Sequence, residues 1–599
     1  MAPISAERCI GGNDLTEPRL SPDATMLVYA RSTSGGASLM LSMLDGAPPR
    51  QLSVYPQPRP GRGLGGGCFC WTPDSAAVVY AGADGNLWLQ PVPGGQVRRL
   101  TGQGPDRAAQ APVVTPDGHQ VVYVVDQQEV WITAIDVGGG SSDAPARLDD
   151  GSADFCFDPA VWPDGSSVCW QAWSVPDMPW DAARTQRVTA TGAPVAIVQP
   201  KGAAQQPRAM PDGTPICVRD DTGWNNIWLG DRPLVDEPFE HAGPTWGLGQ
   251  RSYAVSPDGA NVAFTRNELG FGRLCAVHVA SGAVHDVARA VHGQLSWQGD
   301  RLAALRTGAR TPTQVVVYDT RTWDRVVVDI AAVSGWESES LVEPELVEVP
   351  TRDGAIVHAR LFRADEPNGH LLCWLHGGPT DQWQVTFMPR GAYWRSRGFN
   401  VLVPDHRGSS GHGRAYQQAM NGRWGELDVD DTVDAVRHAH ASGWGTPERT
   451  VVMGGSAGGF TVLGVVGREP DIAACAVVSF PVTDLFDLGE RSHRFERHYT
   501  HHLVAPLPEV RPVDGPYIDR SPISFAARIR TPLLMLHGDA DPVVPVEQSR
   551  MMAAAIAEAG GIVALCVYEG EGHGFRQPEH QLDEYRRIGS FIAEHVGQD

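Results

Sequence analysis

The sequence predicts two domains, a seven-bladed β-propeller followed by an α/β domain. Three observations carry this prediction. The 599 residues exceed the length of one ordinary domain. A Pro-Asp word recurs through the first half at steps of 43 to 51 residues. The second half instead alternates apolar runs of strand length with amphipathic segments of helix length, which is the pattern of an α/β domain.

The recurring word is an apolar, Ser or Thr residue, then Pro-Asp, then a β-rich run. Pro presets φ in a tight turn, Asp bonds its own backbone, and a following Gly accepts positive φ. One hairpin every ~40–50 residues leaves room for four short strands, as in a propeller blade. The six clear copies and a degenerate seventh occupy 21–23, 72–74, 115–117, 162–164, 210–212, 256–258 and 296–300. An array of β-sandwiches is the alternative, and the long regular period disfavours it.

The pattern changes near residue 340. Strand-like runs at 314–319 and 325–330 end the repeats, and a short polar stretch follows. We therefore expect residues 1–338 to form the propeller and residues 339–599 to form the α/β domain. The later runs are apolar on both faces, as buried parallel strands are. They occupy 371–375, 400–404, 450–453, 473–480, 532–536 and 562–568.

Composition excludes several classes of protein. The net charge of −22 leaves no electrostatic footprint for nucleic acid or anionic lipid. No stretch approaches the ~20 apolar residues of a membrane span, and the N-terminus lacks the pattern of a secretory signal. The ten cysteines are scattered, and the Cys68-x-Cys70 pair has no partner pair at zinc spacing. We expect a cytoplasmic protein with no metal, no nucleic-acid partner and no membrane association.

Three residues at the ends of predicted strands suggest hydrolytic chemistry. Ser456 lies in a G-x-S-x-G between the strand at 450–453 and a helix-like run, the context of a nucleophile elbow. Asp541 follows the predicted strand at 532–536, and His573 follows the predicted strand at 562–568. Both therefore lie at the carboxyl ends of strands, the edge where open α/β sheets bind ligands. The order Ser, Asp, His is that of α/β-hydrolases. The predicted fold class is thus a β-propeller followed by an α/β-hydrolase domain.

The predicted roles follow from acyl-transfer chemistry. His573 removes the proton from Ser456 Oγ and returns a proton to the leaving group, while Asp541 holds the imidazole and stabilises its cation. The oxyanion needs two preorganised donors. We assign them to the backbone N–H of Ala457 and the backbone N–H of Gly378, the latter in the His-Gly-Gly-Pro loop at 376–379.

With these motifs in place, the chain resembles the prolyl oligopeptidase family of serine peptidases along essentially its whole length. It is most similar to the acylaminoacyl-peptidase and dipeptidyl-aminopeptidase-like branches. The motifs are HGGP at 376–379, DHRGSSG at 405–411, GRWGELD at 422–428, GGSAGG at 454–459, HGDAD at 537–541 and GEGHGF at 570–575. The resemblance also favours Asp541 over the rival acid Asp539, because Asp541-x-x-Val-Pro matches the family pattern.

The resemblance implies that the propeller gates access to a site for short peptides and that no cofactor is needed. It leaves a homo-oligomer open. In prolyl oligopeptidases proper, a Tyr that supplies an oxyanion donor stands where this chain has His376, so backbone donors are implied here. Val543 stands where acylaminoacyl peptidases often carry Arg and dipeptidyl peptidases carry Asn, which makes it a candidate substrate-binding residue.

Further candidates for reading the substrate come from unusual stretches. Asp177 and Asp181 lie in a Trp-rich insertion within a blade, where either carboxylate could pair with a substrate amine, and Glu240 is a weaker candidate of the same kind. The alternative is a solvated loop. Leu485 and Phe486 follow the strand at 473–480 and could line the pocket for the residue before the cut. The alternative is that these two side chains are ordinary members of the hydrophobic core.

We expect a serine peptidase that hydrolyses short peptides or aminoacyl amides through an acyl-enzyme, acting as an exopeptidase of the aminopeptidase or acylaminoacyl type. An esterase or amidase acting on a small metabolite with the same triad is the alternative, because a triad does not determine its substrate. A non-enzymatic propeller with a decayed hydrolase is a third hypothesis, and the intact motifs argue against it.

Overall fold

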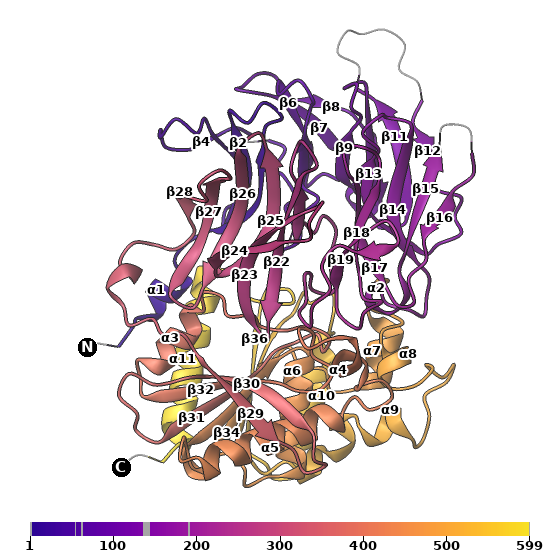
Figure 1. Ribbon diagram of the computed structural model, residues 1–599. Helices are drawn as coiled ribbons and strands as arrows, with labels where there is room; N and C mark the ends of the chain where they lie inside the picture. Colours follow the sequence, from indigo (N-terminus) through magenta and orange to yellow (C-terminus); the bar gives the residue numbers. More distant parts are fainter. Residues whose placement is uncertain (1–2, 54, 62–63, 136–143, 190–191, 598–599) are drawn as a thin grey trace. The chain divides into compact units, whose positions relative to one another are not determined.

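The computed structural model describes residues 3–53, 55–61, 64–135, 144–189 and 192–597 (Figure 1). The chain forms two compact units. The propeller unit comprises Gly12–Val333 with Gln384–Phe387, and the catalytic unit comprises Met1–Gly11, Ser334–Trp383 and Met388–Asp599. The main boundary lies between Val333 and Ser334, whereas the sequence placed it between residues 338 and 339. In addition, two short segments, Met1–Gly11 and Gln384–Phe387, each belong to the unit that is distant from them in sequence.

Hydrogen bonds hold each of these two short segments in its unit. In the catalytic unit, Ile4 N donates to Ser396 Oγ at 3.0 Å, and α1 (Ala6–Ile10) lies beside α3 (Pro389–Arg395) and α11 (Pro578–His595) (Figure 1). In the propeller unit, Val385 N donates to Gly270 O at 2.7 Å.

Seven four-stranded antiparallel sheets, each made of consecutive strands, form the propeller unit in the part of the chain that the structure describes. The predicted seven blades are therefore confirmed. Blades one to three contain β1 (Asp14–Leu20), β2 (Leu27–Thr33), β3 (Gly36–Ser42), β4 (Arg50–Gln51), β5 (Phe69–Trp71), β6 (Ala77–Ala81), β7 (Leu87–Pro91), β8 (Arg98–Arg99), β9 (Ala109–Val114), β10 (Gln120–Val125), β11 (Glu129–Ala134) and β12 (Ala146–Arg147). Blades four and five contain β13 (Phe155–Val161), β14 (Ser167–Trp173), β15 (Arg184–Thr189), β16 (Val195–Val198), β17 (Ala204–Ala209), β18 (Pro215–Arg219), β19 (Asn226–Leu229) and β20 (Arg232–Pro233). Blades six and seven contain β21 (Tyr253–Val255), β22 (Asn261–Glu268), β23 (Phe271–His278), β24 (Val284–Arg289), β25 (Val291–Gln298), β26 (Arg301–Gly308), β27 (Thr311–Asp319) and β28 (Arg325–Ile330).

Every Pro-Asp word lies in the turn between the first and second strands of a blade. In the first blade, Ser21 Oγ donates to Asp23 Oδ1 at 2.6 Å, and the same contact joins Thr72 to Asp74 in the second. The Asp carboxylate thus replaces a backbone acceptor in the turn. The degenerate seventh word begins in the last three residues of β25 and ends in the turn before β26.

The ring closes by packing, because among the described strands no sheet combines members from the two ends of the propeller sequence. An apolar cluster joins the first and last blades, with Leu15 and Tyr29 on one side and Leu305 and Val315 on the other. The Tyr29 hydroxyl also donates to Asp329 Oδ2 at 2.6 Å. Burial of this apolar surface supplies the closing free energy that a shared strand would otherwise provide.

Two loops meet in the middle of the ring. The loop at 64–67 precedes the second blade and the loop at 248–249 precedes the sixth, and Gly66 N donates to Leu248 O at 2.8 Å. First strands of other blades bind both loops. Glu17 of β1 accepts from Cys68 N at 2.9 Å, Asp158 of β13 accepts from Gly249 N, and Gln294 Nε2 of β25 donates to Leu64 O at 2.6 Å.

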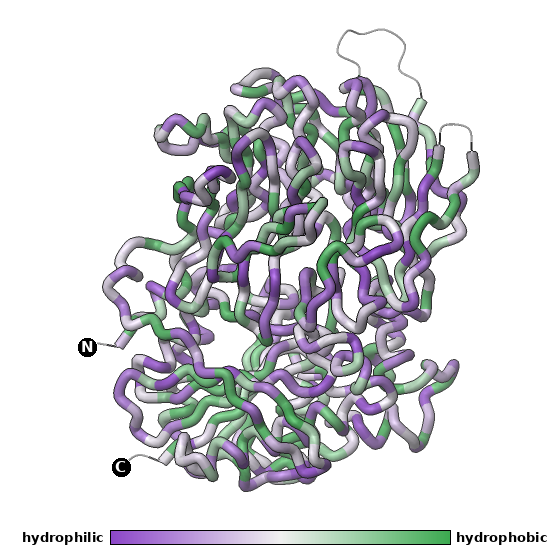
Figure 2. Tube along the Cα trace, in the orientation of Figure 1, coloured by the Kyte–Doolittle hydropathy of each residue, from purple (hydrophilic) through white to green (hydrophobic). Residues whose placement is uncertain are grey.

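The catalytic unit is built on an eight-stranded sheet in the order β29-β30-β32-β31-β33-β34-β35-β36. The β29–β30 and β30–β32 pairs are antiparallel and the other pairs are parallel. The strands are β29 (Glu345–Pro350), β30 (Ile356–Phe362), β31 (His370–Leu375), β32 (Phe399–Asp405), β33 (Thr450–Gly455), β34 (Cys475–Ser479), β35 (Leu533–Gly538) and β36 (Val563–Tyr568). Each predicted apolar run is confirmed as a strand, with ends shifted by one or two residues, and Figure 2 shows much of this sheet in green.

Helices α5 (Leu427–Ala441), α6 (Ala457–Arg468) and α10 (Val546–Glu558) bury apolar faces against this sheet in one continuous core. The remaining helices are α2 (Pro179–Ala182), α4 (Arg414–Gln418), α7 (Leu485–Arg491), α8 (Thr500–Leu503) and α9 (Pro516–Asp519). Short 3₁₀ turns are η1 (Pro105–Arg107), η2 (Trp336–Ser338), η3 (Pro447–Arg449) and η4 (Pro522–Arg528). Within the described residues, no helix combines the length and apolarity that crossing a membrane requires.

Candidate active site

Ser456 occupies a strained turn between β33 and α6. Its φ of 56° and ψ of −125° are rare for a residue with a side chain. Two glycines allow the helix to cross this close to the sheet. A Cβ on Gly454 would lie 2.6 Å from the Gly458 carbonyl carbon, and a Cβ on Gly458 would lie 2.5 Å from His376 O. The serine therefore has the strand–turn–helix setting of a nucleophile elbow.

Asp541 and His573, which follow β35 and β36, are in contact. His573 Nδ1 lies 2.7 Å from Asp541 Oδ2. The Asp541 side chain is fully buried, whereas the His573 side chain keeps 18% of its surface exposed. Oδ1 of Asp541 accepts from the backbone N–H groups of Val543 and Val544 at 2.8 and 3.0 Å. These two bonds determine which oxygen is left for the histidine.

Burial opposes ionisation of Asp541, but hydrogen bonds from His537 and His573 outweigh it. The pKa of this carboxyl is therefore held well below its usual range. His537 is fully buried, with Nε2 3.4 Å from Asp541 Oδ2 and 2.9 Å from Val544 O. Its Nδ1 lies 2.8 Å from Ser549 Oγ. Asp541 is thus a carboxylate facing two imidazole rings.

The rival acid Asp539 has a different partner. It is exposed, and its Oδ1 accepts from Gly570 N at 2.7 Å. That bond fastens the loop after β36 to the loop after β35. The carboxylate in contact with His573 is therefore that of Asp541.

The expected oxyanion donors lie on either side of the serine. Ala457 is the first residue of α6, and the first N–H groups of a helix have no acceptor within it. On the other side, a Cβ on Gly377 would lie 3.5 Å from Ser456 Cβ. Gly378 follows with a φ of 120°, a conformation that favours glycine.

His376 holds the peptide unit that carries the Gly378 N–H. Its Nδ1 lies 2.7 Å from Gly377 O, and its Nε2 lies 2.8 Å from Ser409 Oγ. Burial lowers the pKa of this imidazole to about 4, so the ring is neutral at physiological pH. Since the C=O of Gly377 and the N–H of Gly378 belong to one planar trans peptide, holding the oxygen directs the N–H to the opposite side.

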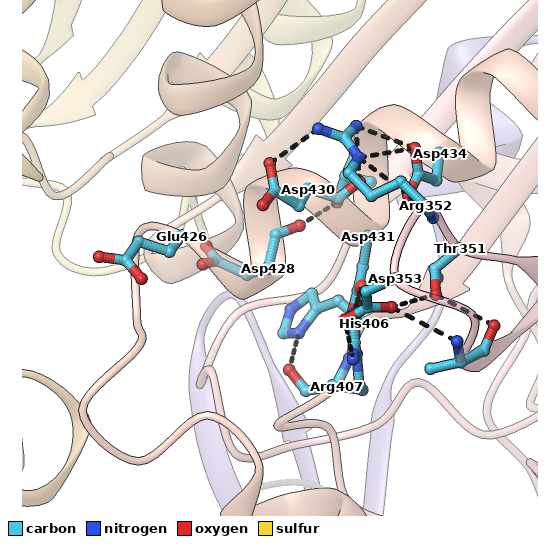
Figure 3. Close-up of polar contacts among 12 residues, drawn as sticks. Thr351, Arg352, Asp353, His406, Arg407, Glu426, Asp428, Asp430, Asp431 and Asp434 are labelled. Carbon is cyan, nitrogen blue, oxygen red and sulfur yellow. Dashed lines mark hydrogen bonds and ion pairs between the residues drawn. The ribbon is translucent and has the colours of Figure 1, made fainter.

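The ring of His406 stacks on that of His376, with centroids 4.9 Å apart. Figure 3 shows how the loop that carries His406 is held. Arg407 N donates to Asp431 Oδ2 of α5 at 2.8 Å, and its guanidinium binds Asp431 at 2.6 Å and Asp353 at 2.8 Å. This network fixes the loop after β32, and through His406 it supports the histidine beside the oxyanion loop.

A second arginine in Figure 3 ties the β29–β30 turn to the same helix. Arg352 binds Asp434 at 2.8 Å and Asp430 at 3.1 Å. Behind them, the buried Asp428 accepts from Gly425 N at 2.7 Å and from the Thr461 hydroxyl of α6 at 2.5 Å. Helix α5 is therefore fastened to the helix that begins at the candidate nucleophile.

The predicted substrate-binding residues of the catalytic unit lie in two places. Leu485 is fully buried and Phe486 nearly so, at the start of α7, where Asp484 caps the helix by accepting from Phe486 N at 3.1 Å. Val543 is half-buried and its N–H is engaged by Asp541.

Two of the predicted acids of the propeller unit, Asp181 and Glu240, accept hydrogen bonds from nearby backbone N–H groups. Asp181 accepts from Met178 N at 3.1 Å and caps α2, and the buried Glu240 accepts from Asn225 N at 2.7 Å. The insertion that carries Asp177 and Asp181 packs on a neighbouring loop, with the rings of Trp180 and Trp246 4.6 Å apart.

Two residues beside the predicted triad were not singled out from the sequence. Phe480 ends the β34 region with a φ of 39°, and its ring lies 4.5 Å from that of His573. His537 contacts Asp541. His537 begins the HGDAD motif and could have been suspected from that position, but nothing local distinguishes Phe480 from an ordinary strand residue.

The chain is similar to several known proteins. Residues 385–599 match the profile described as the prolyl oligopeptidase family. Dipeptidyl aminopeptidase BIII of Pseudoxanthomonas mexicana is 24% identical over 99% of this chain and 88% of its own length. An acylamino-acid-releasing enzyme of Arabidopsis thaliana is 31% identical over 36% of this chain.

Two of the curated relatives align with this chain over only about a third of their own length. The chain spans 29% of the Arabidopsis enzyme and 35% of dipeptidyl peptidase family member 6 of Caenorhabditis elegans.

Among solved structures, a puromycin-hydrolyzing peptidase of Mycobacterium tuberculosis is similar over 100% of this chain and 97% of its own, with a TM-score of 0.90 and 27% identity. Puromycin hydrolase is similar over the same shares, with a TM-score of 0.87 and 27% identity, and a serine-to-alanine variant of it was solved in complex with PGG.

Proposed function

Because residues 385–599 form a peptidase domain of the prolyl oligopeptidase family, we propose that this chain is an exopeptidase that cleaves short peptides or aminoacyl amides through an acyl-enzyme on Ser456. Similarity along the whole chain to two puromycin-hydrolysing proteins supports the substrate class, since puromycin contains an aminoacyl amide bond. The contact between His573 and Asp541 is the observation that carries the proposal.

The histidine acts first. With Nδ1 of His573 bound to Asp541 at 2.7 Å, the lone pair on Nε2 is left to accept the proton of Ser456 Oγ. As the oxygen attacks the scissile carbonyl, the imidazole becomes a cation. The buried carboxylate of Asp541, whose low pKa keeps it ionised, stabilises that cation.

The developing oxyanion is bound by the N–H groups of Ala457 and Gly378. Both belong to backbone held in place, one by helix α6 and the other by the bond from His376 to Gly377, so little reorganisation is required during the reaction. Collapse of the tetrahedral intermediate passes a proton from His573 to the leaving amine. Water then attacks the ester on Ser456 by the same steps in reverse order.

An assay of aminoacyl p-nitroanilides, their N-acetylated forms, puromycin and p-nitrophenyl esters tests the proposal. We expect turnover of at least one amide series, with loss of activity in Ser456→Ala. Turnover of esters without any amide would replace the proposal with the esterase alternative. Turnover of amides that survives Ser456→Ala would refute the nucleophile.

A further inference from the structure

Asp381 lies in the loop that carries the proposed oxyanion donor Gly378. Adjacent glycines link this acid to the nucleophile. A Cβ on Gly377 would lie 3.5 Å from Ser456 Cβ, and a Cβ on Gly378 would lie 3.1 Å from Asp381 Cβ. The side chain remains partly accessible to solvent. The Cβ of Asp381 therefore lies beside Gly378, the residue whose N–H is the proposed oxyanion donor.

The surroundings of Asp381 do not neutralise its charge. Its Oδ1 accepts from Gln382 N at 2.8 Å, and among the described residues no arginine, lysine or histidine forms an ion pair with it. Burial, with a smaller contribution from the charge of Asp405, raises the pKa of Asp381 to about 6.

Two other acids of the catalytic unit, the buried Asp405 and Asp431, have cationic or imidazole partners. Asp405 accepts from both terminal nitrogens of Arg360 at 2.5 Å and lies 2.7 Å from His412 Nε2. Asp431 binds Arg407 at 2.6 Å. Asp381 thus differs from them in having no such partner in the described structure, which points to a partner that arrives with the substrate.

An ionised carboxylate beside an oxyanion site is unfavourable for acyl transfer, because like charges repel. A substrate cation next to the scissile carbonyl would remove this repulsion. The α-ammonium of an N-terminal residue is attached to the carbon adjacent to that carbonyl, so it occupies the required region in any aminoacyl substrate.

We propose that Asp381 is a specificity-determining residue that binds the free α-ammonium of the residue whose carbonyl is attacked. This inference rests on the proposed peptidase function and specifies it as that of an aminopeptidase. Asp381 becomes the first candidate for the residue that binds the substrate amine, ahead of Asp177, Asp181 and Glu240. The reason is that Asp381 lies on the same loop as the proposed oxyanion donor.

The experiment compares kcat/KM for alanyl and N-acetyl-alanyl p-nitroanilide in the full chain, in Asp381→Asn and in Asp539→Asn. The control is matched, since Asp539 is also an acid whose carboxylate accepts one backbone N–H. In Asp381→Asn we expect a fall of about 10- to 100-fold for the free amine, the range of a charge-assisted hydrogen bond, and no fall for the acetylated substrate. Asp539→Asn should leave both values within about twofold.

Two further measurements exclude a purely structural role. Asp381→Glu should recover part of the preference for the free amine, since it restores the charge. The preference for the free amine over the acetylated substrate should rise with pH around the Asp381 pKa of about 6, and Asp381→Asn should lose that rise. With the nucleophile removed in Ser456→Ala, alaninamide should bind more weakly once Asp381→Asn is added.

The outcomes separate the two proposals. Equal losses on both substrates, or no loss on either, would overturn the role of Asp381 while leaving the peptidase intact. A wild-type protein that prefers the acetylated substrate would overturn it as well. Failure of the wild type to cleave any amide would overturn the proposed function, and this inference with it.

Discussion

Nδ1 of His376 lies 2.7 Å from the carbonyl oxygen of Gly377. The bond is local, but it determines the direction of the next N–H, that of Gly378, because both groups belong to one peptide plane. A buried neutral imidazole therefore acts as a clamp on one half of the proposed oxyanion site.

The first prediction concerns this clamp. His376→Ala should lower kcat by about 10- to 100-fold with a small change in KM, somewhat less than the loss of an oxyanion donor itself. His376→Asn should recover part of the rate, since its amide N–H can replace Nδ1–H. Steady-state kinetics on the best amide substrate, with melting temperatures to monitor folding, measure both. A wild-type kcat in His376→Ala would show that Gly378 needs no clamp.

A second prediction separates the two candidate acids. Asp541→Asn should reduce kcat by about 10⁴-fold, because the amide cannot stabilise the imidazolium and favours the wrong tautomer. Asp539→Asn should change kcat by no more than about twofold, since the side chain is exposed and, among the described residues, its carboxylate accepts a hydrogen bond only from Gly570 N. The reverse order of effects in single-turnover assays would assign the triad to Asp539.

The third prediction concerns pH and stability in the propeller unit. The buried His292 lies 2.9 Å from Ala290 O and 2.8 Å from the Tyr318 hydroxyl, and burial lowers its pKa to about 3. Between pH ~6.5 and ~3 the unfolded chain binds a proton that the folded protein does not, so stability falls as pH falls through this window.

His292→Gln should therefore flatten the pH dependence of unfolding by up to about 1.4 kcal/mol per pH unit, whatever its effect at neutral pH. The exposed His119 provides the control, because His119→Gln should leave the slope unchanged. Urea titrations at several pH values measure the slope. An unaltered slope in His292→Gln would mean that this ring is protonated in the folded state.

A fourth prediction tests the loops that meet inside the propeller. A Cβ on Gly249 would lie 2.0 Å from Gly67 N, and Gly249 has a φ of 71°. Gly249→Ala should lower the free energy of unfolding by more than about 2 kcal/mol, through overlap and backbone strain together. Gly247→Ala is the matched control, since its added methyl meets nothing within 4 Å. Equal stability of the two variants in urea would contradict this packing.

The blades and the apolar strands could be predicted because their signals are local. A Pro-Asp turn needs only consecutive residues, and a strand buried on both faces is apolar along its own length. Ser456 could also be predicted from local signals, because the small residues that flank it allow a helix to cross close to the strand. The unit boundaries were harder, since Ile4 joins Ser396 and Val385 joins Gly270 across long stretches of chain.

By itself, the sequence determined the seven repeats, the order of strands and loops in the second half, and the residues able to perform acyl transfer. Only the tertiary structure decided which acid contacts His573, that His537 and Phe480 adjoin the pair, and that Asp381 has no cationic partner in the described chain. The physical reason is that a side chain's charge state and partners depend on groups brought near it by folding, and these are not its neighbours in sequence.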